Sequence, residues 1–181
     1  MVDNVTADDN LVWIDLEMTG LDVETCAIVE IAAVITGDDL KPLAQYEAAI
    51  HQPEGVLAGM NDFVRNMHTS SGLLERVRAS AISVGQAERA ICDLVAQHAK
   101  PREAVMAGNS IHVDRRFIAK YMPTLDGFMH YRQVDVSSLK VLAAAWYPTL
   151  PKFEKKKEHT ALSDIKESLA ELAYFKANLF K

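Results

Sequence analysis

The chain has 181 residues, 49% of them hydrophobic, and its 25 acidic and 19 basic residues give a formal net charge of −6. This length and composition are typical of one folded globular domain and exclude a disordered or fibrous protein. The acidic balance disfavours a protein that tracks along a long polyanion, because such binding needs a basic groove that touches many phosphates. A short anionic ligand could still be held by a few local contacts and bridging metal ions.

The sequence also predicts the environment of the protein. Cys26 and Cys92 form no CxxC pair and no zinc-ligand spacing, so we expect no disulfide framework and a reducing, cytoplasmic compartment. Residues 1–10 lack the apolar core of a secretory signal, and we expect them to be a flexible tail on a single domain spanning residues 1–181. The longest apolar run, residues 141–147, is far shorter than the ~20 residues of a membrane span, so no membrane association is expected.

The first half of the chain predicts strands followed by broken helices. Short Ile- and Val-rich runs bounded by turn formers indicate strands, and glycines interrupt a helical pattern. In order, the expected elements are a buried strand at 11–14 ending on Asp15, a turn at 18–22, a strand at 26–36, a hairpin turn at 37–39, an ambiguous third strand at 43–50, and a helical stretch at 56–80 interrupted at Gly59 and Gly72. Three antiparallel strands in sequence are the economical interpretation.

The second half alternates strands and helices. The expected elements are a helix capped by Ser83 with Gln86 in a capping-box position, a strand at 104–107, a helix at 111–121 ended by Pro123, a strand at 134–136, a helix capped by Ser137 and Ser138 and running to Trp146, a loop at 148–158, and a last helix at 161–178. Strands first, then strand–helix alternation, predict an α/β domain with a mixed sheet flanked by helices.

The first candidate for chemistry is the pair Asp15 and Glu17. Side chains two apart on a strand point to the same face, so both carboxylates project together. Two adjacent carboxylates repel each other unless a cation lies between them, and Mg²⁺ or Mn²⁺ prefers oxygen ligands of this kind. A solvated acidic turn after an edge strand is the alternative for this pair alone.

Three further candidates follow later in the chain. Asp114 lies in the first turn of a predicted helix, where an aspartate is often only a partner of the helix dipole. Asp164 is expected in the first turn of the last helix, and His159 precedes that helix in the loop. Histidine suits general-base catalysis because its ordinary pKa is about 6.5. Taken singly, His159 and Asp164 could be a surface histidine and a dipole-compensating carboxylate.

The order of these residues, DxE, then D, then HxxxxD, is more informative than any of them alone. Each is expected at the end of a strand or the start of a helix, positions that meet at one edge of an α/β sheet. Three or four carboxylates can hold two Mg²⁺ ions about 4 Å apart, the geometry used for in-line displacement at phosphorus. The spacing therefore indicates a two-metal phosphodiesterase, without naming its substrate.

Four segments, IDLEMTGLD, GNSIHVDRRF, HYRQVDVSSLK and HTALSDIKESLAELAYF, resemble the oligoribonuclease branch of the DEDDh 3′→5′ exonucleases, from about Leu11 to the C-terminus. The resemblance implies an RNase H-like fold with a five-stranded sheet, a homodimer, and a 3′→5′ exoribonuclease that hydrolyses two- to five-nucleotide RNAs, dinucleotides especially, to 5′-mononucleotides. It also implies two Mg²⁺ or Mn²⁺ ions on Asp15, Glu17, Asp114 and Asp164, with His159 as the general base.

The resemblance further implies a set of substrate-binding positions. Leu21 matches an apolar wedge between two bases, Phe63 an aromatic stacking residue, and His68 a residue near the substrate. The group that closes around the 5′ phosphate is matched by Ser110, Arg132, Ser137 and Ser138. Tyr131 matches a tyrosine delivered by the partner subunit. Without the resemblance, Leu21 reads as a packed turn residue, the two serines as helix N-caps, and Tyr131 as a strand flank.

The chain departs from the family pattern at three places. Phe63 stands where a tryptophan is frequent, which keeps an aromatic face for stacking. Ala143 and Ala144 stand where arginines are frequent, which removes positive charge near the expected dimer surface. Lysines 155–157 could draw phosphate towards the loop of His159 or form a solvated charge run.

Two rival functions remain open from the sequence. Another DEDDh exonuclease that trims tRNA ends or proofreads DNA would need an extended basic groove, which the net charge of −6 disfavours. A non-catalytic nucleotide-binding module that keeps the fold would not need all five catalytic positions filled.

Overall fold

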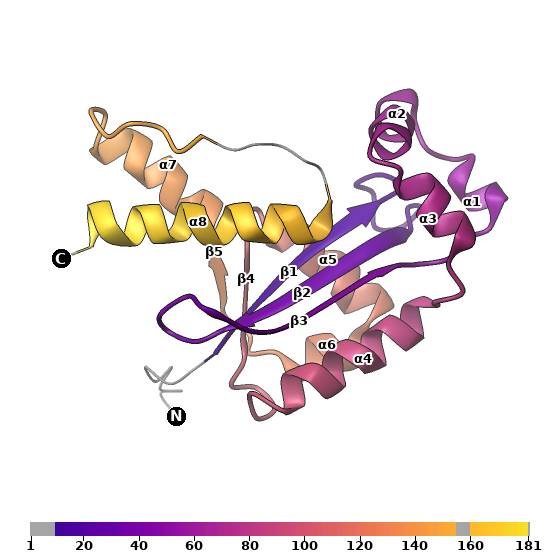
Figure 1. Ribbon diagram of the computed structural model, residues 1–181, viewed down its shortest axis with the longest axis horizontal. Coiled ribbons are helices and arrows are strands. Elements are labelled where there is room, and N and C mark those ends of the chain that lie inside the picture. Colours follow the sequence, from indigo (N-terminus) through magenta and orange to yellow (C-terminus); the bar gives the residue numbers. More distant parts are fainter. Residues whose placement is uncertain (1–9, 155–159, 181) are drawn as a thin grey trace.

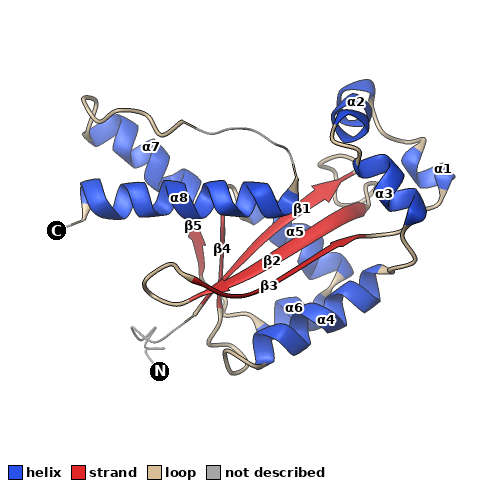
Figure 2. Ribbon diagram, viewed as in Figure 1, coloured by secondary structure: helices blue, strands red, loops and turns tan. Residues whose placement is uncertain are grey.

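The computed structural model describes residues 10–154 and 160–180, and it contains one five-stranded sheet with helices on both faces (Figures 1 and 2). The strands are β1 Leu11–Met18, β2 Ile28–Thr36, β3 Pro42–Ala49, β4 Val105–Gly108 and β5 Gln133–Asp135. The helices are α1 Glu54–Leu57, α2 Asp62–Ser70, α3 Leu73–Ala79, α4 Val84–Ala96, α5 His112–Tyr121, α6 Pro123–Phe128, α7 Val136–Trp146 and α8 Ala161–Leu179. The expected α/β class with a mixed five-stranded sheet is confirmed.

The sheet order is β3-β2-β1-β4-β5. The first three strands are antiparallel, whereas β1 and β4, and β4 and β5, pair in parallel. All nine residues of β2 are buried, as expected for an interior strand covered on both faces. The hairpin between β2 and β3 turns at Gly37, whose carbonyl accepts a hydrogen bond from the Leu40 N–H at 3.1 Å.

Side-chain alternation divides the core into two layers. One face of the sheet, with Val12, Ile14 and Ile31, packs against α4, α5 and α6. The opposite face, with Trp13 and Val34, packs against α7 and α8. In Figure 1, α8 lies across this second face, which also carries the odd-numbered residues Asp15 and Glu17 of β1.

The helices α1, α2 and α3 form a separate group beside one end of the sheet (Figure 1). Their apolar side chains, including Leu57, Leu73 and Val77, enclose Val29 of β2 in a third, smaller cluster. Gly72, in the left-handed conformation at φ 71°, separates α2 from α3, so the expected interruption at this glycine is confirmed.

Three local predictions were wrong. β1 does not end at Asp15, because its pairing with β2 continues to Met18. Pro123 follows the end of α5 as expected, but it also begins α6, a helix that the sequence did not predict, since proline suits the first helical turn. The N-cap of α7 is Asp135, whose carboxylate accepts from the Ser137 N–H at 2.9 Å, so neither Ser137 nor Ser138 is the cap.

Other boundary predictions are confirmed. Ser83 caps α4, and its side chain and that of Gln86 form the expected capping box. Within residues 10–154 and 160–180, no helix is long and apolar enough to cross a membrane. The expected flexible tail lies outside the described residues apart from Asn10, whose amide donates to the His98 carbonyl at 2.6 Å.

Candidate metal centre

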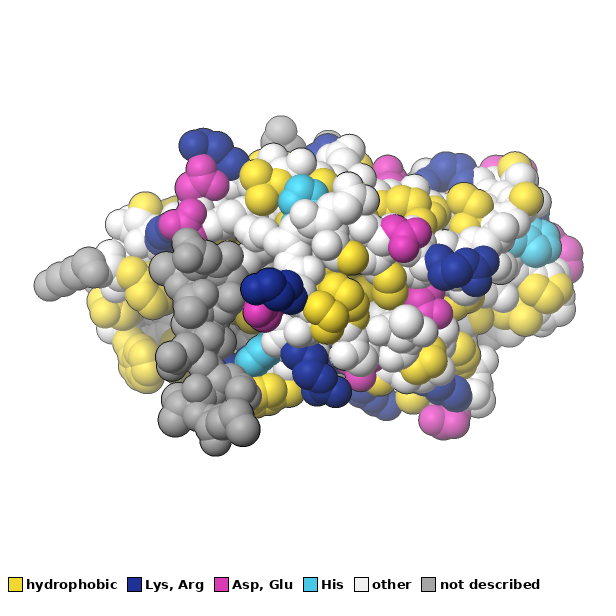
Figure 3. All heavy atoms as spheres, turned by 90° about the horizontal axis from the view of Figure 1, so that it is seen from below, with side chains coloured by type: hydrophobic (Ala, Val, Ile, Leu, Met, Phe, Trp, Pro, Cys, Tyr) yellow, Lys and Arg dark blue, Asp and Glu magenta, His cyan; other side chains and the backbone are white. Residues whose placement is uncertain are grey.

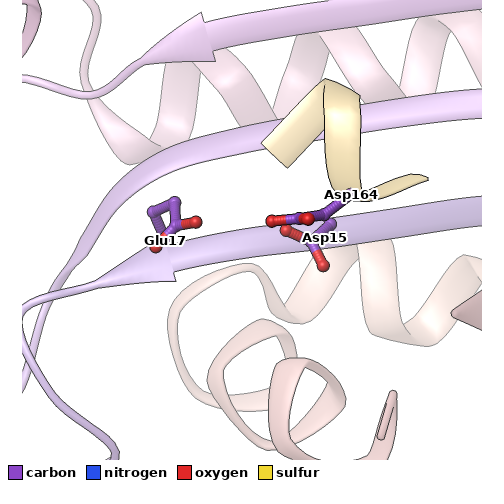
Figure 4. A group of neighbouring side chains, drawn as sticks. All are labelled: Asp15, Glu17 and Asp164. Atoms are coloured by element: carbon purple, nitrogen blue, oxygen red, sulfur yellow. The ribbon is translucent and has the colours of Figure 1, made fainter. Parts of the chain in front are cut away.

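Three carboxylates converge on the face of the sheet that α8 covers. Asp15 and Glu17 project from β1, and Asp164 projects from the first turn of α8. Each offers an oxygen within 4.8 Å of the others, and Figure 4 shows Asp15 and Asp164 side by side with Glu17 further along the strand. The predicted convergence of these three residues at one place is therefore present in the structure.

The position of Asp164 follows from the way α8 begins. Thr160 is the N-cap, its hydroxyl accepting from the Ser163 N–H at 3.4 Å, and the Asp164 N–H donates to the Thr160 carbonyl at 2.9 Å. The buried side chains Ile165 and Leu169 then pack against the sheet in the same cluster as Trp13. Because this apolar face is held down, the first turn of α8 presents Asp164 to β1.

Asp114, on α5, contacts the backbone of β1. Its Oδ1 accepts a hydrogen bond from the Leu16 N–H at 3.0 Å. The pairing of β1 with β4 reaches only to Trp13, so the side chain of Asp114 takes the place of a missing strand for Leu16. Asp114 is not one of the three residues whose oxygens lie within 4.8 Å, but its charge contributes to the raised pKa of Asp15.

Burial and mutual repulsion raise the pKa of three of these carboxyls. Burial raises the pKa of Asp15 well above its ordinary value, and the charges of Asp114, Asp164 and Glu17 raise it further. Burial, with the charge of Asp164, raises the pKa of Glu17 from 4.5 to about 8. Burial likewise raises the pKa of Asp114 from 3.8 to about 7, although the hydrogen bond from Leu16 lowers it.

This environment fits a divalent cation. A cluster of crowded, largely desolvated carboxylates is costly by itself, and a cation among them offsets both the repulsion and the lost hydration. The donor set is made of carboxylate oxygens, which suits a hard ion such as Mg²⁺ or Mn²⁺. Asp15, Glu17 and Asp164 could together hold a metal ion.

His68 lies directly beside this group. It is only 1% exposed, and its Nε2 lies 2.9 Å from the Met18 carbonyl, which can only accept, so Nε2 carries the proton. The other ring nitrogen, Nδ1, faces Glu17 Oε2 at 3.8 Å, beyond hydrogen-bond distance, and has no hydrogen-bond partner among residues 10–154 and 160–180. Nδ1 can therefore accept a hydrogen bond from a polar group placed beside Glu17.

The serines predicted to close around a phosphate come together at the start of α5 and α7. The Ser110 N–H donates to Asp135 Oδ1 at 2.9 Å and to Ser137 Oγ at 3.0 Å, and the two serine hydroxyl oxygens are 3.2 Å apart. Ser110 has a φ of 52°, in the left-handed region that side chains other than glycine rarely adopt. Ser138 is exposed on the first turn of α7.

The remaining predicted substrate residues are at the surface. Leu21 is 71% exposed in the loop after β1, and Phe63 is 78% exposed in the first turn of α2. Tyr131, 59% exposed, stacks on His130 with ring centroids 4.5 Å apart, and the Arg132 guanidinium lies 5.2 Å from the Tyr131 ring centre. These large apolar side chains are available for contacts outside the subunit core.

Two of the expectations concern residues that lie outside those described by the structure. His159 and Lys155–157 belong to the segment 155–159, so their roles stay predictions. Two polar residues of this region were not predicted from the sequence. Glu30 is a fully buried carboxylate in β2, and Asn109 donates to Ser168 Oγ at 2.8 Å and accepts from Ser137 Oγ at 3.0 Å. A charged residue inside the otherwise apolar run IVEIAAVIT was the available signal for Glu30.

The alanines that replace frequent arginines line a groove of about 430 Å³ between α7 and α8, together with Lys140 and Phe175. Ala143 is buried against α8, whereas Ala144 is exposed. Arginine side chains at these positions would occupy part of the groove, so their replacement changes the surface between the two helices.

The sequence is similar to a known protein family and to curated relatives. The RNase T family model, described as an exonuclease, matches residues 12–172. An oligoribonuclease of Francisella tularensis subsp. tularensis is 49% identical over 172 residues, which cover 94% of this chain and 96% of the relative. An oligoribonuclease of Paracidovorax citrulli is 46% identical over 175 residues, covering 96% and 91% of the two chains.

Solved structures agree on the fold. Exonuclease I of Methylocaldum szegediense has a TM-score of 0.72 at 15% identity, and exonuclease I of E. coli, in complex with a dT13 oligonucleotide, has a TM-score of 0.75 at 12% identity. Each match covers 95% of this chain but only 41% of the exonuclease I chain. The expected RNase H-like exonuclease fold is thus confirmed. The chain belongs to the RNase T exonuclease family, with oligoribonucleases among its relatives, and it is a nuclease.

Proposed function

We propose that this nuclease is a 3′→5′ exoribonuclease that hydrolyses RNAs of two to five nucleotides, dinucleotides especially, to 5′-mononucleotides by a two-metal mechanism. The observation that carries the proposal is the convergence of Asp15, Glu17 and Asp164 in a chain whose curated relatives, of nearly equal length, are named oligoribonucleases. Asp114, buried beside β1, is the fourth proposed ligand of two Mg²⁺ or Mn²⁺ ions.

The chain's own residues have distinct tasks in this proposal. Bound cations would activate the attacking water and stabilise the leaving oxygen. The carboxylates on β1 and α8 would hold the cations to which the reacting phosphate binds, and both elements are fixed by packing to the same face of the sheet. His159, which directly precedes the N-cap Thr160, is proposed to accept the proton of the water.

Short substrates are favoured by contacts at both ends of the ligand. Leu21 and Phe63 present exposed apolar surface for the bases, and His68 Nδ1 is available beside Glu17 for a polar group of the substrate. At the other end, Ser110, Ser137, Ser138 and Arg132 are proposed to close around the 5′ phosphate. A chain continuing past that phosphate would meet this group, so longer RNAs should bind less well.

Charge distribution supports the same conclusion. Figure 3 shows the side of the molecule that carries α4 and α6, opposite the candidate metal centre; basic, acidic and hydrophobic side chains are interspersed there, and the described residues of this side form no continuous basic band. A tracking nuclease would need such a band to neutralise many phosphates. The net charge of −6, taken over the whole sequence, therefore favours a short substrate over the rival exonucleases that act on long nucleic acids.

A homodimer is part of the proposal. α7 and the residue after it expose the large apolar side chains Val141, Trp146 and Tyr147 at 67%, 68% and 47%, and exposed apolar surface of this kind suits a protein interface. We propose that a second copy covers this surface and that the exposed Tyr131 enters the partner's site.

Cys26 and Cys92 are both free thiols, in keeping with the proposed cytoplasmic location of a single-domain enzyme.

A substrate-length series tests the proposed activity. With Mn²⁺, hydrolysis of a 5′-phosphorylated dinucleotide should be faster than that of a long unstructured RNA, and EDTA or Asp114→Ala should abolish it. His159→Ala should reduce turnover by on the order of 10²- to 10⁴-fold. Faster cleavage of the long RNA would refute the short-substrate proposal. Tight binding without hydrolysis would favour the non-catalytic module instead.

Subunit mixing tests the role of Tyr131. Tyr131→Ala and Asp114→Ala should each be nearly inactive alone, for different reasons. In a mixed dimer, the site with intact carboxylates receives Tyr131 from the Asp114→Ala partner, so mixing should restore activity. If Tyr131 acted within its own subunit, mixing would restore none.

A further inference from the structure

Glu30 is a buried carboxylate next to the candidate metal centre. It is the third residue of β2, is 0% exposed, and is the direct cross-strand partner of Glu17. Directly opposed residues of an antiparallel pair share a face, so Glu30 lies on the face that carries Asp15 and Glu17. A charged group buried to this degree is retained only when it has partners.

Both oxygens of Glu30 have a partner from a different helix. Oε1 forms a close ion pair with the Arg76 guanidinium of α3. Oε2 accepts a hydrogen bond from the N–H of Ala161, the first residue of α8, at 3.1 Å. A negative charge at this end of α8 also interacts favourably with the helix dipole.

These two contacts tie together the parts of the molecule that build the site. Ala161, whose N–H binds Glu30, lies in the same helical turn as Asp164, one of the three converging carboxylates. Arg76 belongs to the group of helices α1 to α3, which also carries His68 and Phe63. Glu30 therefore fixes both groups to the strand that neighbours Glu17.

We propose that Glu30, with Arg76, is a positioning residue: it holds the first turn of α8 so that Asp164 meets Asp15 and Glu17 at metal-binding distance. The inference rests on the proposed metal-dependent function. Glu30 is not proposed as a ligand, because its two oxygens are already occupied by Arg76 and the Ala161 N–H. Partners of this kind usually change metal affinity by 10- to 100-fold when they are altered.

A purely Coulombic role makes a different prediction. If Glu30 acted only through its charge, removing it would weaken cation binding, and removing the positive charge of Arg76 would strengthen it. If the pair acts by positioning, loss of either partner releases the start of α8, and both changes weaken binding. The two roles thus predict opposite signs for the Arg76 variant.

The experiment measures Mn²⁺ binding to the full chain without substrate, from the electron paramagnetic resonance signal of free Mn²⁺. Glu30→Gln replaces one acceptor oxygen with an N–H₂ group, so one of the two contacts is lost. Glu30→Gln and Arg76→Met should each weaken Mn²⁺ binding by roughly 10-fold or more. Arg76→Lys, which keeps a charged donor, should recover most of the affinity.

The matched control is Arg78→Met on the same helix. Arg78 pairs at the surface with Glu54 at 2.7 Å and Glu75 at 2.8 Å and does not contact Glu30. Arg78→Met removes the same charge from α3 as Arg76→Met but breaks no contact with Glu30, so the variant should leave Mn²⁺ affinity unchanged. Thermal unfolding in EDTA verifies that each variant is folded.

Each outcome has one meaning. Tighter Mn²⁺ binding by Arg76→Met, or unchanged binding by both folded variants, would overturn the positioning role while leaving the proposed function intact. No Mn²⁺ binding by the unaltered chain would overturn the proposed function itself. If Glu30→Gln does not fold, the Arg76 variants decide, because the Arg76 side chain is 41% exposed and tolerates replacement better.

Discussion

In the absence of bound cations, the stability of this protein should fall as the pH rises. The pKa of Glu17 is raised from 4.5 to about 8, and that of Asp114 from 3.8 to about 7, by burial and neighbouring charge. Between its ordinary and its raised pKa, each carboxyl binds more protons in the folded than in the unfolded chain. The stabilising contribution of protonation is therefore fully present below about pH 4 and is lost as the pH rises through 7 to 8.

The size of the effect follows from Glu17. Each pKa unit corresponds to about 1.4 kcal/mol, so a rise from 4.5 to about 8 sets an upper limit of about 5 kcal/mol for this group alone. The neighbouring carboxyls share the same repulsion, so their contributions cannot be added to it. A loss on the order of a few kcal/mol lowers the Tm of a chain of this length by roughly 5–10 °C.

Bound cations should reverse this trend. They bind the ionised carboxylates, so binding releases protons and becomes tighter as the pH rises. Differential scanning calorimetry at several pH values between 5.5 and 8.5, in EDTA and in Mn²⁺, measures both effects. The Tm in EDTA should fall across this range, and the increase in Tm caused by Mn²⁺ should grow with pH.

Glu17→Gln is the control for the other titrating groups of the chain. It keeps the shape of the side chain but removes its proton equilibrium, so the decline of Tm in EDTA should be shallower than in the unaltered chain. A flat or rising Tm in EDTA, or an equal effect of Mn²⁺ at pH 5.5 and 8.5, would refute the reasoning.

Two further predictions separate stability from substrate binding. Trp13 Nε1 donates to Thr36 Oγ1 at 3.0 Å in the core, so Thr36→Val should leave the indole N–H unpaired and lower the free energy of unfolding by about 1–3 kcal/mol in a denaturant titration, without changing KM; an unchanged stability would contradict this. Phe63 is 78% exposed, so Phe63→Ala should leave Tm unchanged but raise the KM for a dinucleotide roughly 5- to 100-fold through lost stacking, and a lowered Tm with unchanged KM would show a structural role instead.

The carboxylates of the site were predictable because local rules place them. Alternation along a strand puts Asp15 and Glu17 on one face, and the N-terminal signal of α8 places Asp164 in its first turn. The distance between these two elements was only inferred from the general behaviour of α/β sheets. The hydrogen bond of Asp114 to the Leu16 N–H could not be predicted, because it depends on where the pairing between β1 and β4 stops.

Errors in the fold arose where neighbouring residues carry the same local signal or where one residue carries two. Asp135, Ser137 and Ser138 are all good N-caps, and the choice among them depends on the end of β5, which three residues of sequence cannot define. Pro123 ends one helix and begins another, and the sequence offers the same proline for both. In each case tertiary pairing decides between local alternatives of similar energy.

Glu30 shows why positioning residues are harder to predict than ligands. A ligand is recognised by its chemical type and its spacing from other ligands, which are both readable along the chain. Glu30 reads only as a charge interrupting an apolar strand, a sign that partners exist but not of which ones. Those partners, Arg76 and the Ala161 N–H, are 46 and 131 residues away, and only the folded sheet brings them to the two oxygens of one carboxylate. The chemistry of this site is local in the sequence, whereas the geometry that makes it effective is not.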